Sequence, residues 1–129
     1  MQANSIDEQI ERILEKVQND TSGLLGFVLF TMDGFPVKST LPHSSSNEIS
    51  EHELFSAIGA GLISLAEKTL KQINMMPLDK LTIESNNGNI IVERITDSVG
   101  IMALALPTTP LGMIRIAVQN AKKALKGLL

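Results

Sequence analysis

The sequence contains no cysteine, tryptophan or tyrosine, and its only aromatic residues are four phenylalanines. The absence of cysteine excludes disulfide bonds, thiolate metal sites and cysteine nucleophiles. The scarcity of aromatic side chains argues against stacking platforms for single-stranded nucleic acid. A net charge of −3 gives no electrostatic reason to expect nucleic acid either.

The sequence also lacks long apolar runs. Its apolar stretches are shorter than a membrane span, and its N-terminus lacks the basic and apolar regions of a secretory signal. We therefore expect a cytoplasmic location and no membrane insertion. Of the 129 residues, 43% are hydrophobic and 19% are charged, which is typical of a folded domain with one core. No repeat or internal boundary is visible, so we interpret residues 1–129 as a single domain.

Motifs of enzyme chemistry are missing as well. No glycine-rich phosphate loop followed by Lys-Ser/Thr is present, so the chain is not expected to be a GTPase itself. We interpret His43 and His52 as surface residues of a loop and an early helical turn. Glu51 and Glu53 complement the dipole of a helix start and need no acid–base role. We predict no catalytic residue, no metal site and no cofactor, and no enzymatic activity.

Three segments carry helical signals. Ser5 to Glu8 forms a capping box ahead of apolar residues that recur at helical spacing to about Asn19. A second capping box at 50–53, with a hydrophobic staple between residues 49 and 54, opens a helix that runs to about residue 74. The third helix is predicted to have Thr109 as its cap, Pro110 at its first position and its end near Gly127.

The first predicted hairpin turns at Asp33-Gly34. Its first strand is apolar on both faces from Phe27 to Phe30, which predicts a central position in a sheet covered on both sides. The return strand, 35–41, contains Pro36 and should lie at an edge, because proline cannot donate to the ladder.

Three further strands complete the sheet. Segments 78–85 and 89–95 flank Asn87-Gly88, a strong hairpin signal. Segment 99–106 is again apolar on both faces, which predicts a central strand beside the first one. The order α-β-β-α-β-β-β-α predicts an α+β fold, an antiparallel sheet with helices on its faces.

The second predicted helix is apolar or small around most of its circumference. Such a helix needs cover on two sides. The sheet of the same chain can cover one side of this helix. The other side requires an additional packing surface.

The chain resembles the Roadblock / dynein light chain family over nearly its whole length. The resemblance is carried by "GFVLFTMDGFPVKSTLP", "HELFSAIGAGLISLAEKTLKQI", "LDKLTIESNNGNIIVERI", "VGIMALAL" and "TTPLGMIRIAVQNAKKAL" in this order and spacing. It implies a five-stranded antiparallel sheet with the middle helix on one face and the terminal helices on the other. It further implies a dimer in which third strands pair and middle helices pack together.

The resemblance implies a scaffold or regulator of small Ras-like GTPases or motor complexes. We therefore expect a homodimer that binds such a GTPase or assembles a signalling complex. The expected dimer interface comprises Ala57, Ile58, Gly61, Leu62, Ser64, Leu65, Leu81, Thr82 and Ile83. The expected partner-binding residues are Glu51, Lys68, Lys71, Gln72 and Met75.

Two alternatives stay open. The first is a GTPase-activating protein, for which Arg94 or Arg115 could supply an arginine finger, although surface ion pairs are the favoured interpretation of both. The second is a small-molecule sensor with a pocket between helix and sheet. Met75-Met76 could form an adaptable binding patch, but we favour packing of both residues into the corner between helix and strand.

Overall fold

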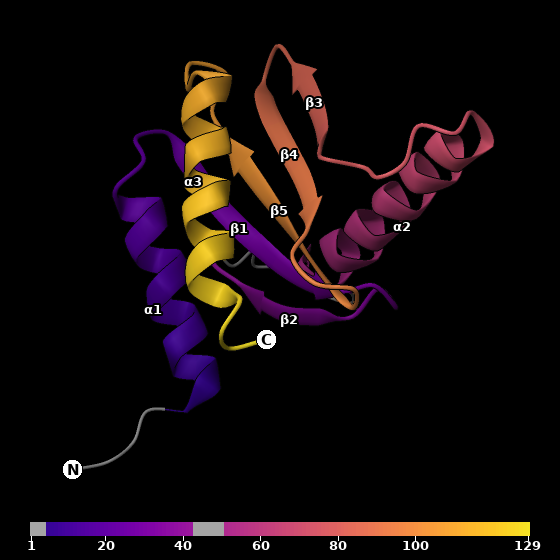
Figure 1. Ribbon diagram of the computed structural model, residues 1–129. Coiled ribbons are helices and arrows are strands. Elements are labelled where there is room, and N and C mark those ends of the chain that lie inside the picture. Colours follow the sequence, from indigo (N-terminus) through magenta and orange to yellow (C-terminus); the bar gives the residue numbers. More distant parts are fainter. Residues whose placement is uncertain (1–4, 43–50) are drawn as a thin grey trace.

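The computed structural model describes residues 5–42 and 51–129. These residues form eight elements in the predicted order (Figure 1): α1 (Ile6–Asn19), β1 (Leu24–Thr31), β2 (Pro36–Ser39), α2 (Glu51–Gln72), β3 (Leu81–Ser85), β4 (Gly88–Arg94), β5 (Val99–Ala105) and α3 (Leu111–Leu125). All strand pairs are antiparallel, and the sheet order is β2-β1-β5-β4-β3. The predicted α+β architecture is confirmed.

The strands predicted to be buried on both faces lie side by side. β1 pairs with β5, and Phe27 to Phe30 are fully buried. β2, which begins at Pro36, forms one edge of the sheet, as a proline in the strand requires. The other edge is β3, which begins at Leu81 and is therefore shorter than the segment predicted from residue 78.

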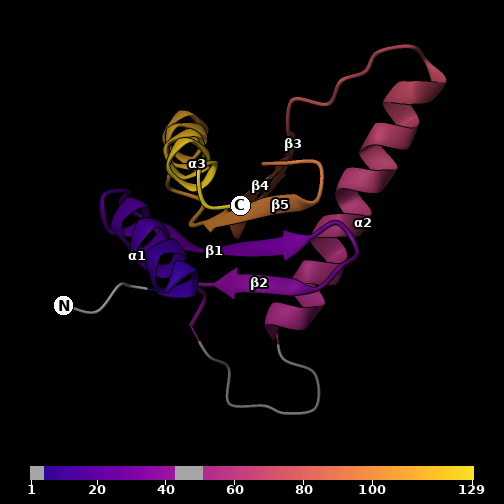
Figure 2. The ribbon, with the colours of Figure 1, turned by 60° about the horizontal axis from the view of Figure 1, so that its bottom comes forward.

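Two hydrophobic cores lie on opposite faces of the sheet. Phe27 and Leu29 of β1 pack with α1 and α3 on one face. Val28 and Phe30 of the same strand pack with α2 on the other face. Figure 2 shows α1 and α3 next to each other, with α2 apart from both. Each fully buried large apolar side chain contributes about 1.5–3 kcal/mol to folding, so β1 anchors both layers.

The predicted start of α3 is wrong by one residue. Pro110, not Thr109, is the N-cap, and no side chain in the described part of the chain caps this helix. Thr109 is buried, and its hydroxyl donates instead to the carbonyl oxygen of Ser22 at 3.2 Å. Thr109 therefore ties the loop before α3 to the loop before β1, a long-range contact that local sequence signals do not contain.

The β3–β4 turn is also displaced by one residue from the prediction. Its two residues are Asn86 and Asn87, and Gly88 already pairs with Ser85 in the ladder. At the start of α1, the Ser5 hydroxyl accepts from the Glu8 backbone N–H at 3.1 Å, as a capping box requires. The Glu8 carboxylate, however, accepts from the Ser5 hydroxyl. The second predicted capping box begins outside the described residues.

Candidate interaction surface

Helix α2 is only partly covered by its own sheet. Its buried residues are Ser56, Gly59, Ala60 and Ile63, and none follows Ile63 in this helix. In Figure 1 the C-terminal half of α2 extends away from the strands. A long helix with an uncovered half needs another surface if its apolar residues are to be buried.

The outward side of α2 carries a row of apolar side chains. Leu54, Ile58 and Leu65 are 51%, 41% and 64% exposed, and the spacing of 4 and 7 residues places them on one helical face. Ala57 and Gly61 lie between them and are also exposed. We call these five residues the α2 row. Its mixture of large and small side chains suits close packing against another helix.

The two glycines of the α2 centre face opposite environments. A Cβ atom added to Gly59 would lie 2.6 Å from Cε1 of Phe30, so this glycine allows α2 to approach the sheet closely. A Cβ atom added to Gly61 would meet nothing within 4 Å. Gly61 therefore has no packing role within the described fold. A larger side chain at this position would test contacts between molecules without disturbing contacts within the chain.

The sheet beneath α2 is left uncovered beyond the helix. A hollow of about 200 Å³ lies over β3, β4 and β5, lined by Leu25, Ile83, Ile90 and Leu104 among others. Leu25 and Ile83 are exposed. Next to this hollow, β3 presents an unpaired ladder edge. Apolar surface and open strand edge therefore occur together.

The structure divides the residues predicted for the dimer interface into two groups. Seven are exposed on α2 and β3: Ala57, Ile58, Gly61, Ser64, Leu65, Thr82 and Ile83. Leu62 and Leu81 are partly buried and pack against the core under α2. These two side chains already have a structural role within the chain.

The five predicted partner-binding residues, Glu51, Lys68, Lys71, Gln72 and Met75, are all exposed. The favoured interpretation of Met75-Met76 as corner packing is wrong, because Met75 is 63% exposed and Met76 is exposed too. Residue 43, the histidine predicted to lie in a loop, is outside the described residues. His52 is half-buried in the first turn of α2.

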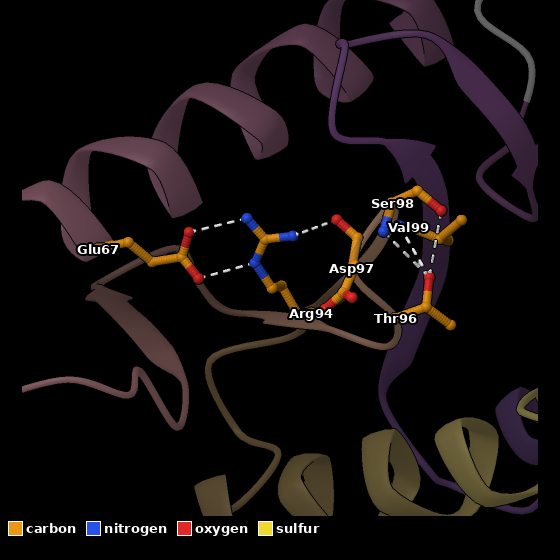
Figure 3. Close-up of polar contacts among 6 residues, drawn as sticks. All are labelled: Glu67, Arg94, Thr96, Asp97, Ser98 and Val99. Atoms are coloured by element: carbon orange, nitrogen blue, oxygen red, sulfur yellow. Dashed lines mark hydrogen bonds and ion pairs between the residues drawn. The ribbon is translucent and has the colours of Figure 1, made fainter.

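Arg94 fastens the projecting half of α2 to the sheet (Figure 3). Its Nε and Nη2 donate to the two carboxylate oxygens of Glu67 at 2.7 and 2.9 Å, and Nη1 donates to the Asp97 carbonyl oxygen. The bond from Arg94 holds the pKa of Glu67 below its ordinary value, and Glu67 raises the pKa of Arg94. The predicted ion pair of Arg94 is confirmed.

Sequence reasoning missed Phe35 as part of this surface. Phe35 is exposed in the turn between β1 and β2, beside a hollow of about 600 Å³ whose lining includes Pro36, Leu54 and Ala57. The hollow therefore continues the α2 row toward the β2 edge. The sequence does show a large apolar residue, Phe35, directly after the turn glycine Gly34. Only the fold places Phe35 next to Leu54.

The described residues hold no group of three or more His, Cys, Asp or Glu side chains that could bind a metal ion. None of the helices in 5–42 and 51–129 has both the length and the apolar character that crossing a bilayer requires.

Comparison with known proteins decides the family. The model of the Roadblock/LC7 domain matches residues 10–105. The chain belongs to the Roadblock/LC7 domain family. The match begins in α1 and ends with the last residue of β5, so it includes α2, β3 and the whole sheet.

Proteins similar to this chain share little of its sequence. Uncharacterized protein MJ1340 of Methanocaldococcus jannaschii is 28% identical over 92% of this chain and 98% of its own. The gliding protein MglB of Thermus thermophilus has a TM-score of 0.81 at 14% identity, covering 99% of this chain and 93% of that one. MglB in a tetrameric arrangement has a TM-score of 0.82 at 13% identity, with coverages of 99% and 93%.

Proposed function

We propose that this protein is a homodimeric, non-enzymatic regulatory module that binds a small Ras-like GTPase or assembles a signalling or motor complex. The observation that carries the proposal is the exposed apolar α2 row beside the open β3 edge. The Roadblock/LC7 family membership supports it, since resemblance to that family implies dimers and GTPase-linked scaffolds.

Dimerisation through α2 and β3 would cover both uncovered features at once. An open, partly apolar strand edge invites pairing with another strand, and Thr82 and Ile83 lie on that edge. Antiparallel pairing of two β3 strands would extend the sheet across the dimer. The projecting half of each α2 would then lie near the partner's uncovered sheet, where Leu65 could be buried.

A solved relative supports self-association of this fold. MglB has been observed in a tetrameric arrangement, and its fold matches this chain almost completely. We carry over only the tendency to self-associate, and we place the contact on α2 and β3 because the apolar row and the strand edge lie there.

Light scattering coupled to size exclusion tests the dimer directly. We expect a dimer at micromolar protein concentration. Leu65→Asp should weaken it on the order of 100-fold, because the dimer would bury a carboxylate without a partner. Gly61→Leu should weaken it too, while the space around Gly61 leaves the monomer fold intact.

Ile6→Asp is the matched control, because Ile6 is 56% exposed on α1, a helix on the opposite face. This variant should remain dimeric. A monomeric wild-type protein would overturn the proposed dimer, and dimers of both the Leu65 and the Gly61 variants would show that the contact lies elsewhere.

Binding of a Ras-like GTPase is tested separately from the dimer. A pull-down with identification of the bound proteins should recover a Ras-like GTPase. Measuring GTP turnover of that protein with and without this chain then separates a scaffold from a GTPase-activating protein. We expect binding without faster turnover, because the guanidinium of Arg94 is held by Glu67 and Arg115 lies on α3, on the face of the sheet opposite the predicted partner-binding residues.

A further inference from the structure

The charges of this chain are distributed unevenly along its sequence. All 14 acidic residues lie within residues 1–97. Residues 98–129 carry only positive charges, from Arg115, Lys122, Lys123 and Lys126. The protein as a whole has a net charge of −3, but every charged residue of α3 is basic. This helix lies on the face of the sheet opposite α2.

The outer side of α3 borders a groove of about 500 Å³. Its lining includes Lys80 from the segment before β3 and Arg115, Ile116, Gln119 and Lys123 from α3. Among residues 5–42 and 51–129, no acidic side chain belongs to this lining. The groove, which we call the α3 groove, is therefore a concave surface with three cationic side chains and several polar ones.

Part of this positive charge is already neutralised within the chain, and part is not. Lys122 donates to the buried carboxylate of Glu93 at 2.8 Å, and Lys80 pairs with the neighbouring Asp79. Arg115 and Lys123 form no salt bridge with any residue in the described ranges. Two cations of the α3 groove are therefore available to an external carboxylate or phosphate.

The cations of the groove act on Asp79, the acidic neighbour of Lys80. Lys80, mainly through its hydrogen bond, holds the pKa of Asp79 below its ordinary value, and the charges of Lys122 and Arg115 add to the effect. Lys80, Arg115 and Lys123 also line the same groove, so cations from α3 and from the chain before β3 lie together. Anionic groups of a binding partner would be stabilised there for the same reason.

Apolar side chains accompany the cations. Ile116 is 62% exposed, and Met113, one turn earlier on α3, is exposed as well. Both also line a second hollow, of about 150 Å³, that continues past α3 to the end of α1 at Val17 and Asp20. Ile116 belongs to both hollows. An occupant could therefore bury an apolar residue at the centre and place negative charges toward Arg115 and Lys123.

We propose that the α3 groove binds an acidic segment of a partner protein, anchored by an apolar side chain on Ile116 and by carboxylates on Arg115 and Lys123. A peptide segment fits because the surface is concave and combines charge with apolar area. A bilayer surface is disfavoured by this concave shape. The site is separate from the α2 row, so it does not depend on the dimer or GTPase proposals.

Selection from a random peptide display library against residues 1–129 tests the site even while the natural partner is unidentified. We expect enriched peptides to carry net negative charge and at least one large apolar residue. Their affinity should fall at least about tenfold in R115E/K123E, and it should also fall as the salt concentration rises. Ile116→Ser should weaken binding as well, while its melting temperature stays close to that of wild type.

The matched control is R115K/K123R, in which both positions keep a positive charge but arginine and lysine change places. Its peptide affinity should stay within about threefold of wild type. Size exclusion should give R115E/K123E the same oligomeric state as wild type. The proposal is overturned by enriched peptides without net negative charge, by peptides that bind R115E/K123E equally well, or by failure to enrich any peptide. Binding of anionic phospholipid vesicles with no acidic peptide selected would overturn it in favour of a membrane surface.

Discussion

The two faces of the sheet are covered to different extents. On one face, the 15-residue α3 buries residues from Ile114 to Leu125, along almost its whole length. On the other face, the 22-residue α2 has no fully buried residue after Ile63, and Ala66 and Leu70 are only partly buried. The longer helix is thus the less covered one. A helix that its own sheet covers over only part of its length indicates a contact with another molecule. In contrast, α3 packs on its own sheet along its length and exposes only Met113 and Ile116 among its large apolar side chains.

The largest effect is expected on the well-covered face, at Glu93 and Lys122. The Glu93 side chain is fully buried, its Oε1 accepts from Lys122, and its Oε2 has no hydrogen-bond partner among the described residues. Lys122→Met would leave a buried carboxylate without its counter-charge, which should destabilise the protein by about 3 kcal/mol. Urea denaturation at fixed protein concentration measures this loss.

A double variant shows whether the loss comes from the stranded charge. In E93L/K122M the buried carboxylate is gone and an apolar side chain fills its place, so most of the stability should return. If Lys122→Met alone leaves the urea midpoint unchanged, the carboxylate does not depend on Lys122, and α3 is held by its apolar contacts only.

A smaller effect should separate the two sides of α2. Gly59→Ala would push a methyl group into the Phe30 ring and should cost about 1–3 kcal/mol. Gly61→Ala meets open space and should stabilise the helix by about 0.5–1 kcal/mol, because glycine is a poor helix former. Thermal melts of both variants in a Leu65→Asp background, where self-association should not contribute, provide the measurement. Equal effects at both positions would contradict the observed rotation of α2.

Much of the fold could be predicted because its signals are local. The doubly apolar Phe27 to Phe30 indicated a strand covered on both sides, and Pro36 indicated an edge. The buried pair of Glu93 and Lys122 could not be predicted, because it exists only once α3 lies across β4. The same reason explains Thr109, whose hydroxyl finds its acceptor far away in the sequence.

The candidate surface was predictable in outline but not in detail. The sequence pattern showed that α2 has apolar residues on too many sides, but it could not determine how the helix is rotated on the sheet. That rotation makes Leu62 a core contact and leaves Leu65 exposed. The exposure of Met75 depends on how far the end of α2 projects beyond the strands, and Phe35 joins the surface only through the arrangement of β2 beside α2.

The smallest effect is expected at the one ion pair that, among the described residues, ties the projecting half of α2 to the sheet. Arg94 and Glu67 are both partly exposed, so Glu67→Gln should cost no more than about 1 kcal/mol. The effect should be local. Relative to wild type, Glu67→Gln should speed hydrogen exchange of the α2 amides after Ile63 and leave exchange of those before it unchanged. Lys16→Ala, which breaks the exposed pair with Asp20 on α1, is the control and should leave α2 unchanged.

The pH dependence of this pair tests its ionic character. Because the folded state lowers the pKa of Glu67, the pair stabilises the protein fully above the ordinary glutamate pKa of about 4.5. This contribution is lost as the pH falls through the lower pKa of the folded state. The stability difference between wild type and Glu67→Gln should therefore be constant near neutral pH and shrink in acid. If the stability difference persists unchanged in strong acid, Glu67 acts through packing. The projecting half of α2 would then be held on the sheet without the charge of the Glu67 carboxylate.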